Sequence, residues 1–179
     1  MNKALAINKQ LVEHYGSEIV LSGDKRLPHI TLSQAVIGEK TMAKAETILK
    51  VIASSFKPLQ LRAKLLQGRN DIQFEVSLSQ ELQALHAQVM AEFKGLVNYD
   101  ARAEYFYDKA ISQRTIDWEH NFTTNAAYDH YYPHITLGNG ELRDTGSELS
   151  FTAERLTIFQ LGNYGTCRKL LVETKLSKI

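Results

Sequence analysis

The sequence has little cysteine, little proline, little net charge and no long apolar run. Its single cysteine, Cys167, excludes a disulfide within the chain, and only three prolines interrupt its 179 residues. A formal net charge of +1 at pH 7 supplies no strong long-range field, so tight non-specific binding to long nucleic acid is not implied. No apolar run reaches the length of a membrane span, and residues 1–8 are too short and too polar for a secretory signal. We therefore expect a soluble, cytoplasmic protein with no membrane partner.

The sequence contains one pentapeptide twice. Pro-His-Ile-Thr-Leu occupies residues 28–32 and residues 133–137, with the two histidines 105 positions apart. Unrelated sequence of this length would give such a pair in roughly one case in a hundred, so internal duplication is the better explanation. Each copy alternates apolar and polar residues, which in a β-strand places the histidine and the threonine on one face. We predict two equivalent strands that present His29 with Thr31 and His134 with Thr136.

Apolar spacing predicts the helices. Residues 41–56 have the pattern of an amphipathic helix, and a second helix follows Ser79 as its N-cap. One stripe of that second helix is apolar: Leu82, Leu85, Val89 and Phe93. Weaker patterns suggest a helix over residues 9–15 with Asn8 as its N-cap, and another helix after Ser112. The loose apolar stripe of the latter consists of Ile116, Phe122 and Ala126.

Strands are predicted in pairs around turns. Residues 59–66 and 72–78 flank a turn that contains Gly68 and Asn70, and residues 151–161 and 167–176 flank the segment 162–165. Residues 4–7 are a further short strand candidate. The order of motif, strand, turn and strand thus occurs in both halves of the chain. Because no linker separates these halves, we predict that residues 1–179 form a single domain with two lobes, one from each half.

Two strand-borne pairs of imidazole and hydroxyl suit the cleavage of a phosphodiester. One histidine near neutral pH can accept a proton from the attacking oxygen while the other protonates the departing oxygen. Two threonine hydroxyls, each two residues along, can donate hydrogen bonds to the non-bridging phosphate oxygens. This arrangement requires no metal and no other cofactor. The sequence leaves open which of His29 and His134 is the acid and which is the base.

At these residues the chain resembles the two-histidine phosphoesterase superfamily, which includes the 2'-5' RNA ligase-like proteins and cyclic nucleotide phosphodiesterases. That superfamily carries two His-x-Thr/Ser-x motifs, and both copies here match fully. The resemblance covers most of the chain, and residues 4–7, 72–78 and 151–161 lie where such proteins have sheet strands. It implies a duplicated, bilobal α+β fold in which two antiparallel sheets flank a central cleft and helices lie outside.

The resemblance also implies a function and a site. The activity would be a metal-independent phosphodiesterase with roles in RNA processing. Its substrates would be 2',3'-cyclic phosphates, ADP-ribose 1″,2″-cyclic phosphate or 2'-5'-linked oligonucleotides. The catalytic pair would be His29 and His134, and Thr31 and Thr136 would bind the phosphate. Residues 99–132 carry no subfamily signature, so the sequence does not select among these substrates.

Other candidate residues are secondary. Tyr132 shares the strand parity of His134 and could stack on a base, and Arg168 could reach a phosphate, as could Arg69 in the earlier turn. Packing or surface solvation is the competing explanation for each of them. The spacing of His130 and His134 suits metal ligands on a helix but not on a strand, so we expect no metal site.

A different class of function remains open. The same fold could serve as a catalytically weak module that binds a nucleotide or RNA, although such a module would be expected to carry damage in one motif. A Gly-x-Ser-x-Gly nucleophile elbow and a Walker loop are both absent from the sequence, which disfavours a serine hydrolase and a nucleoside triphosphatase. The near-neutral charge favours a small nucleotide or an RNA end as the substrate partner, and we expect a monomer.

Overall fold

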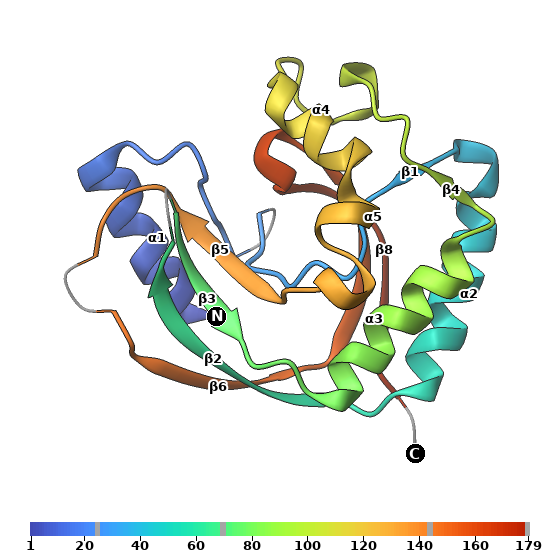
Figure 1. Ribbon diagram of the computed structural model, residues 1–179, viewed down its shortest axis with the longest axis horizontal. Coiled ribbons are helices and arrows are strands. Elements are labelled where there is room, and N and C mark those ends of the chain that lie inside the picture. The colour runs from blue at the N-terminus through green and yellow to red at the C-terminus, as the bar shows by residue number, and fades with distance from the viewer. Residues whose placement is uncertain (24–25, 69–70, 143–144, 178–179) are drawn as a thin grey trace. The chain divides into compact units, whose positions relative to one another are not determined.

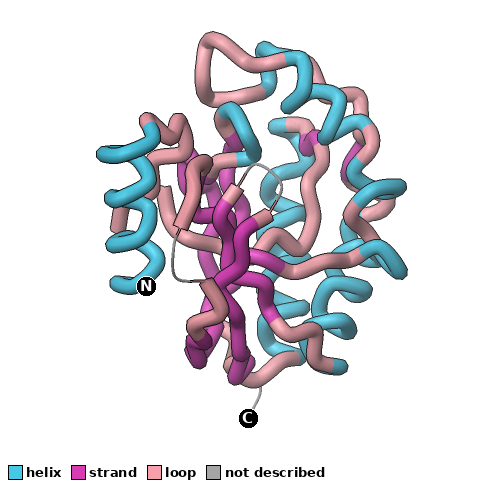
Figure 2. Tube along the Cα trace, turned by 60° about the vertical axis from the view of Figure 1, so that its left-hand side comes forward, coloured by secondary structure: helices cyan, strands magenta, loops and turns pink. Residues whose placement is uncertain are grey.

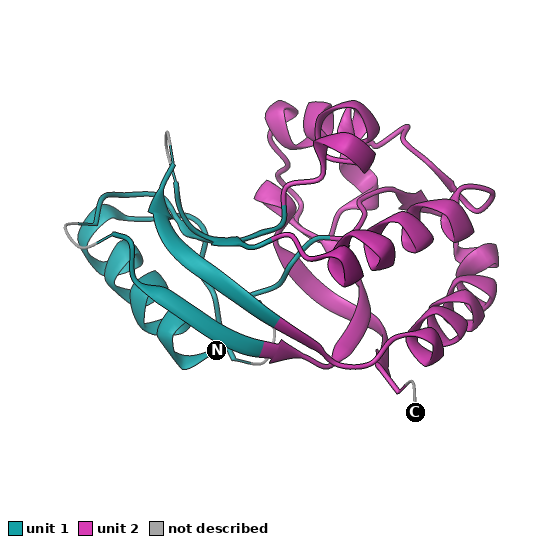
Figure 3. Cartoon of the chain, turned by 60° about the horizontal axis from the view of Figure 1, so that its bottom comes forward, with its two compact units in different colours: residues 1–31, 61–77, 133–151 teal, residues 32–60, 78–132, 152–179 magenta. Residues whose placement is uncertain are grey.

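Helices and strands are mixed along the chain, and the strand pairs with a defined register are antiparallel (Figure 1). The computed structural model describes residues 1–23, 26–68, 71–142 and 145–177. Figure 3 shows two compact units, each built from three separate segments. The first unit holds residues 1–31, 61–77 and 133–151, and the second holds residues 32–60, 78–132 and 152–179. Each unit takes residues from both halves of the chain, so the units differ from the lobes expected from the repeated order.

The first unit is built on a four-stranded sheet with the strand order β5, β3, β2, β6. These strands span His134–Gly138, Ile72–Val76, Leu59–Gln67 and Glu148–Ala153. Buried residues recur at every second position of β2 and β3, and within the unit they are Leu61, Ala63, Leu65, Ile72, Phe74 and Val76. This period of two is the pattern that predicts strands at residues 59–66 and 72–78, and both are confirmed.

Helix α1 spans Asn2–Tyr15 and packs against β5 of this sheet. In Figure 2 it is the helix that begins at the label N. The prediction of a strand at residues 4–7 and of an N-cap at Asn8 is wrong, because all of these residues are helical. A run of four apolar residues suits a buried helix as well as a strand, and here packing on the sheet decides. The buried residues Ala4, Asn8 and Leu11 recur at helical spacing.

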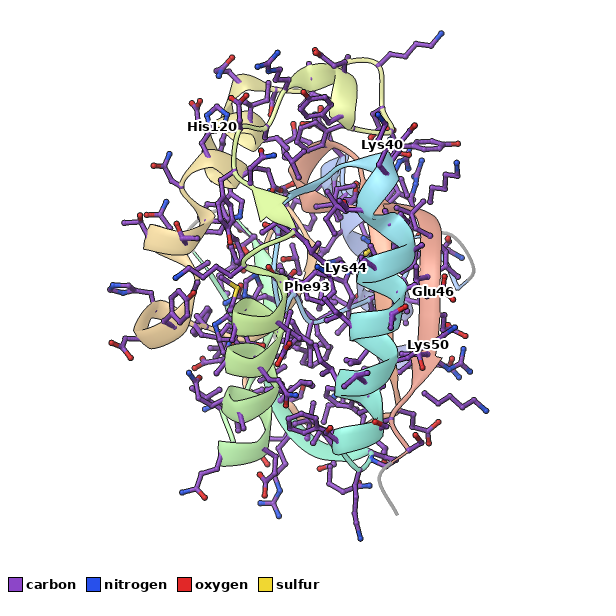
Figure 4. All side chains as sticks on the ribbon, turned by 90° about the vertical axis from the view of Figure 1, so that its right-hand side faces the viewer. Lys40, Lys44, Glu46, Lys50, Phe93 and His120 are labelled. Carbon is purple, nitrogen blue, oxygen red and sulfur yellow. The ribbon has the colours of Figure 1, made fainter. Side chains whose placement is uncertain are left out.

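Two helices and a strand pair are the main elements of the second unit. Helix α2 spans Met42–Ser55, α3 spans Gln80–Phe93, β7 spans Arg155–Leu161, and β8 spans Cys167–Lys175. Figure 4 shows α2 and α3 side by side, with Glu46 and Lys50 on α2 and Phe93 on α3. No helix in the described ranges has both the length and the hydropathy that crossing a bilayer requires.

The two predicted helices, α2 and α3, are confirmed, and so is the β7–β8 pair. The predicted stripe of α3 is buried, and Ser79 Oγ accepts the N–H of Leu82 at 3.2 Å as an N-cap. A second, two-stranded sheet pairs β1 (Val36–Ile37) with β4 (Val97–Asn98). The described residues also form short 3₁₀ segments, namely η1 (Glu39–Thr41), η2 (Ala103–Tyr105), η3 (Tyr128–His130) and η4 (Asn163–Gly165).

Two other expectations need correction. The single strand predicted over residues 151–161 is interrupted at Glu154, because β6 joins the sheet of β2 whereas β7 pairs with β8. The helix after Ser112 exists as α4 (Gln113–His120), and α5 (Phe122–Asn125) follows it. The buried residues of α4 are Thr115 and Glu119 rather than Ile116, so the predicted stripe was partly wrong.

Candidate functional site

The second copy of the motif forms a strand, as its alternation predicts, and this strand lies at the edge of the four-stranded sheet. In β5, His134 lies opposite Glu75 of β3, and Thr136 lies opposite Gln73. Ile135 and Leu137 are buried, with 7% and 0% of their surfaces exposed, whereas the histidine and the threonine between them remain partly exposed. The strand therefore presents an imidazole and a hydroxyl on its accessible face.

The first copy does not repeat this structure. Residues 28–32 have no strand assignment, and all five are partly exposed, without the alternating burial of β5. The expectation of two equivalent strands is therefore wrong. A strand needs a neighbouring backbone with which to exchange hydrogen bonds, and the five identical residues do not carry one with them. Locally, His29 Nδ1 lies 2.9 Å from the carbonyl oxygen of Leu27.

The buried side chain of Asn8 connects the segment before the first copy of the motif to β5, the strand that contains the second copy. Asn8, 2% exposed on α1, donates from Nδ2 to the carbonyls of Ile19 at 2.7 Å and Leu137 at 2.6 Å. Its Oδ1 accepts the N–H of Leu21 at 2.8 Å. Sequence reasoning missed this role, although Asn8 lies four residues after Ala4 and three before Leu11, on one helical face.

The end of β5 is held from the same side. Ser17 Oγ accepts the N–H of Asn139 at 3.0 Å. At Gly138, where φ is +143°, a Cβ atom would lie 2.6 Å from that Ser17 oxygen. Only glycine fits this position, because both the backbone conformation and the close contact exclude a side chain. The segment after α1 is thus fixed against the strand that carries His134.

The electrostatic setting of His29 favours its neutral form. Burial lowers the pKa of His29 below its usual 6.5, and nearby His134 lowers it further, while the contact with Leu27 opposes both. A carbonyl oxygen can only accept, so Nδ1 must carry the proton and Nε2 keeps its lone pair. In this tautomer, a neutral His29 can accept a proton at Nε2, which is what a general base requires.

The four motif residues belong to the first unit, and the two secondary candidates belong to the second unit. Tyr132 is 46% exposed. Arg168 donates to Asp108 Oδ1 from Nε at 2.9 Å and from Nη2 at 2.6 Å, and its guanidinium lies 5.6 Å from the ring centroid of Tyr107. Their proposed substrate contacts stay predictions, and Arg69 lies outside the described residues.

The side chains that bear on metal ligation and thiol chemistry are His130, His134 and Cys167. Within the described ranges, no three His, Cys, Asp or Glu residues are grouped as metal ligands. His130 belongs to η3 and His134 to β5, so the two do not share a helical face. Burial raises the pKa of Cys167 to about 12, which leaves its thiol protonated and a poor nucleophile.

Comparison with known proteins supports the fold. No family model and no curated protein matches the chain. The crystal structure of TT0787 from Thermus thermophilus is similar over 97% of this chain and 93% of that chain, with a TM-score of 0.53 and 15% identity. The crystal structure of the MHV ns2 PDE domain covers 98% of this chain and 90% of its own, with a TM-score of 0.48 and 14% identity. The likeness to TT0787 shows a shared fold, in agreement with the mixed α+β architecture and its antiparallel sheets.

Proposed function

We propose that the chain is a phosphodiesterase of the two-histidine phosphoesterase superfamily that cleaves its substrate without a metal. The observation that carries this proposal is the setting of the two motif histidines. His29 and His134 belong to one compact unit, burial and, to a lesser extent, His134 lower the pKa of His29, and the contact of its Nδ1 with the Leu27 carbonyl leaves Nε2 unprotonated. Two neighbouring imidazoles, one of them favoured as a base, are the groups that acid/base cleavage of a phosphodiester needs.

In the proposed reaction, Nε2 of His29 accepts a proton from the attacking water as its oxygen bonds to phosphorus. His134 donates a proton to the departing ester oxygen as the bond from phosphorus to that oxygen breaks. The products are a phosphomonoester and an alcohol, and the next cycle requires the transfer of one proton from His29 to His134 through solvent. Thr31 and Thr136 donate hydrogen bonds to the non-bridging oxygens, where negative charge increases in the transition state.

The proposed substrates are small: 2',3'-cyclic nucleotides, ADP-ribose cyclic phosphate, or the 2'-5'-linked or cyclic end of an RNA. A protein with a net charge of +1 lacks the many cationic contacts that a long duplex would require. Tyr132 is proposed to stack on a base and Arg168 to contact phosphate. A monomeric cytoplasmic enzyme of RNA processing would fit these substrates.

The alternative is a module that binds the same ligands without turnover. Both copies of the motif are intact, which favours an enzyme, since a module that only binds has no need of two catalytic histidines. The two candidate functions differ in one measurable respect, the release of product.

The test is a substrate panel followed by phosphorus NMR in excess EDTA. Wild type should convert at least one cyclic or 2'-5'-linked substrate to a phosphomonoester, and the signal should also identify which ester bond breaks. His29→Ala and His134→Ala should each reduce turnover by about 10²–10⁴-fold. His14→Ala, which changes an exposed histidine of the same unit, should have no effect. Unchanged turnover in either motif variant would rule out the paired mechanism, and binding without turnover would favour the module.

A further inference from the structure

A third histidine, His86, is completely buried in α3 of the second unit and uses both ring nitrogens. Its Nδ1 lies 2.8 Å from the carbonyl oxygen of Leu32, and its Nε2 lies 2.9 Å from the backbone nitrogen of Tyr128. The ring of Tyr131 stacks on the imidazole, with centroids 3.9 Å apart and planes within 2°.

These contacts determine the state of the ring. The Leu32 carbonyl can only accept, so Nδ1 of His86 carries a proton, and the Tyr128 N–H can only donate, so Nε2 carries none. Burial also lowers the pKa of His86, in agreement with a neutral imidazole. Tyr128 has a left-handed φ of 56°, a conformation that is uncommon for a residue with a side chain. The hydrogen bond from its backbone N–H to His86 Nε2 stabilises this conformation.

The partners of His86 lie where the chain passes between the units. Leu32 is the last residue of the first motif and the first residue that belongs to the second unit. Tyr131 is followed by Tyr132, after which the chain returns to the first unit at Pro133, the start of the second motif. One buried side chain therefore contacts the backbone at the end of one motif and the segment that leads directly into the other.

We propose that His86 is a positioning residue that fixes the backbone on which both His29 and His134 are carried. The contact with Leu32 restrains the first motif, and the contacts with Tyr128 and Tyr131 restrain the approach to the second motif. The catalytic consequence rests on the proposed phosphodiesterase function, whereas the structural consequence can be observed without substrate. Displacement of a catalytic group by about 1 Å can reduce a rate by about 10²-fold, so loss of this residue should lower kcat more than it changes KM.

Two variants separate the two contacts. In His86→Asn, the amide NH2 can take the place of Nδ1 and donate to Leu32, but the shorter side chain does not reach the N–H of Tyr128. In His86→Gln, the amide oxygen can take the place of Nε2 and accept from Tyr128, but the NH2 at the end of the longer side chain no longer occupies the Nδ1 position that faces Leu32. The imidazole resonances of His29 and His134 are recorded by nitrogen-15 NMR on the full chain without substrate.

His86→Asn should shift the resonances of His134 and leave those of His29 in place, and His86→Gln should do the reverse. Tyr131→Leu, which removes the stacked ring but neither bond, should shift His134 alone. The matched control is His120→Gln, since His120 also contacts a backbone carbonyl of the second unit, that of Ala101 at 2.9 Å. This control should shift neither motif histidine.

Kinetics give the second readout. Each His86 variant should reduce kcat by about tenfold with KM nearly unchanged, and His120→Gln should keep wild-type values. Selective shifts in a chain without turnover would contradict the proposed function but support the positioning role. Shifts that are absent, or that affect both histidines equally in both His86 variants, would overturn the positioning role whatever the activity. If one His86 variant fails to fold, the other and Tyr131→Leu decide.

Discussion

The two copies of Pro-His-Ile-Thr-Leu have identical residues but different structures. Residues 133–137 pair with β3 and bury their isoleucine and leucine, whereas residues 28–32 have no strand assignment and bury none of their five side chains completely. The local sequence determines which side chains would share a face of a strand, but a neighbouring backbone determines whether the segment becomes a strand. Identical motifs therefore do not provide identical environments for their histidines.

The different environments of the two copies suit a reaction in which the two histidines have different roles. At the first copy, burial and the nearby His134 favour a neutral His29 whose Nδ1 proton points to Leu27. A symmetric pair would have to be differentiated by the substrate, whereas the proposed mechanism takes the neutral His29 as the base. Variants of each copy can show whether this structural difference is also a functional one.

The largest expected effect concerns the chemical roles of the two histidines. On a nucleoside phosphodiester with a p-nitrophenyl leaving group, protonation of the leaving oxygen contributes little because nitrophenolate departs without help. His134→Ala should then recover most of the activity that it loses on a cyclic nucleotide, while His29→Ala should stay about 10²–10⁴-fold slower than wild type. Release of nitrophenolate measures both. Equal recovery in the two variants would contradict the assignment of His29 as the base.

The next effect concerns stability. Leu137 is fully buried and its counterpart Leu32 is not, so the same change should cost different amounts. We expect Leu137→Ala to lower the free energy of unfolding by about 3–4 kcal/mol and Leu32→Ala by about 1 kcal/mol. Urea denaturation of both variants checks the difference. Similar costs would mean that the two copies are packed alike.

A third prediction addresses the link between the two copies. Asn8→Asp preserves shape and the acceptor for Leu21, but it sets a carboxylate oxygen against the carbonyls of Ile19 and Leu137. The free energy of unfolding should fall by about 2–3 kcal/mol at neutral pH. Asn125→Asp, an exposed change of the same kind, should cost less than about 0.5 kcal/mol. An Asn8→Asp protein as stable as this control would show that the link is not needed.

The smallest effect is on the pH dependence of stability. The pKa of His29 is lowered on folding, so below pH 6.5 the unfolded chain binds the proton more readily and stability is lost as pH falls. His29→Gln should therefore show a smaller loss of stability between pH 6.5 and pH 5 than wild type. Thermal unfolding across this range provides the measurement. A steeper loss in the variant would reverse the sign of the predicted shift.

Much of the fold follows from local sequence signals. The helix over residues 41–56, the capping of α3 by Ser79 and the strands β2 and β3 depend on spacing and caps that the sequence displays directly. The helical state of residues 4–7 and the break at Glu154 depend instead on which elements pack together. Apolar runs alone do not contain that information.

The residues of the candidate site also differ in whether the sequence alone reveals them. The repeat was enough to select His29, His134 and their threonines as candidates, because a duplicated motif is visible without a structure. Asn8 and His86 were missed, since each is a polar residue on the apolar face of a helix and its partners are backbone groups far along the chain. Their burial identifies them only after the chain is folded.

The assignment of His29 as the base of an acid/base pair is tested most directly by a pH titration of its imidazole nitrogens. In wild-type protein without substrate, we predict that His29 is neutral at pH 6.5, carries its proton on Nδ1, and becomes charged only at lower pH. A His29 that is already charged at pH 6.5, or that carries its proton on Nε2, would contradict its assignment as the base.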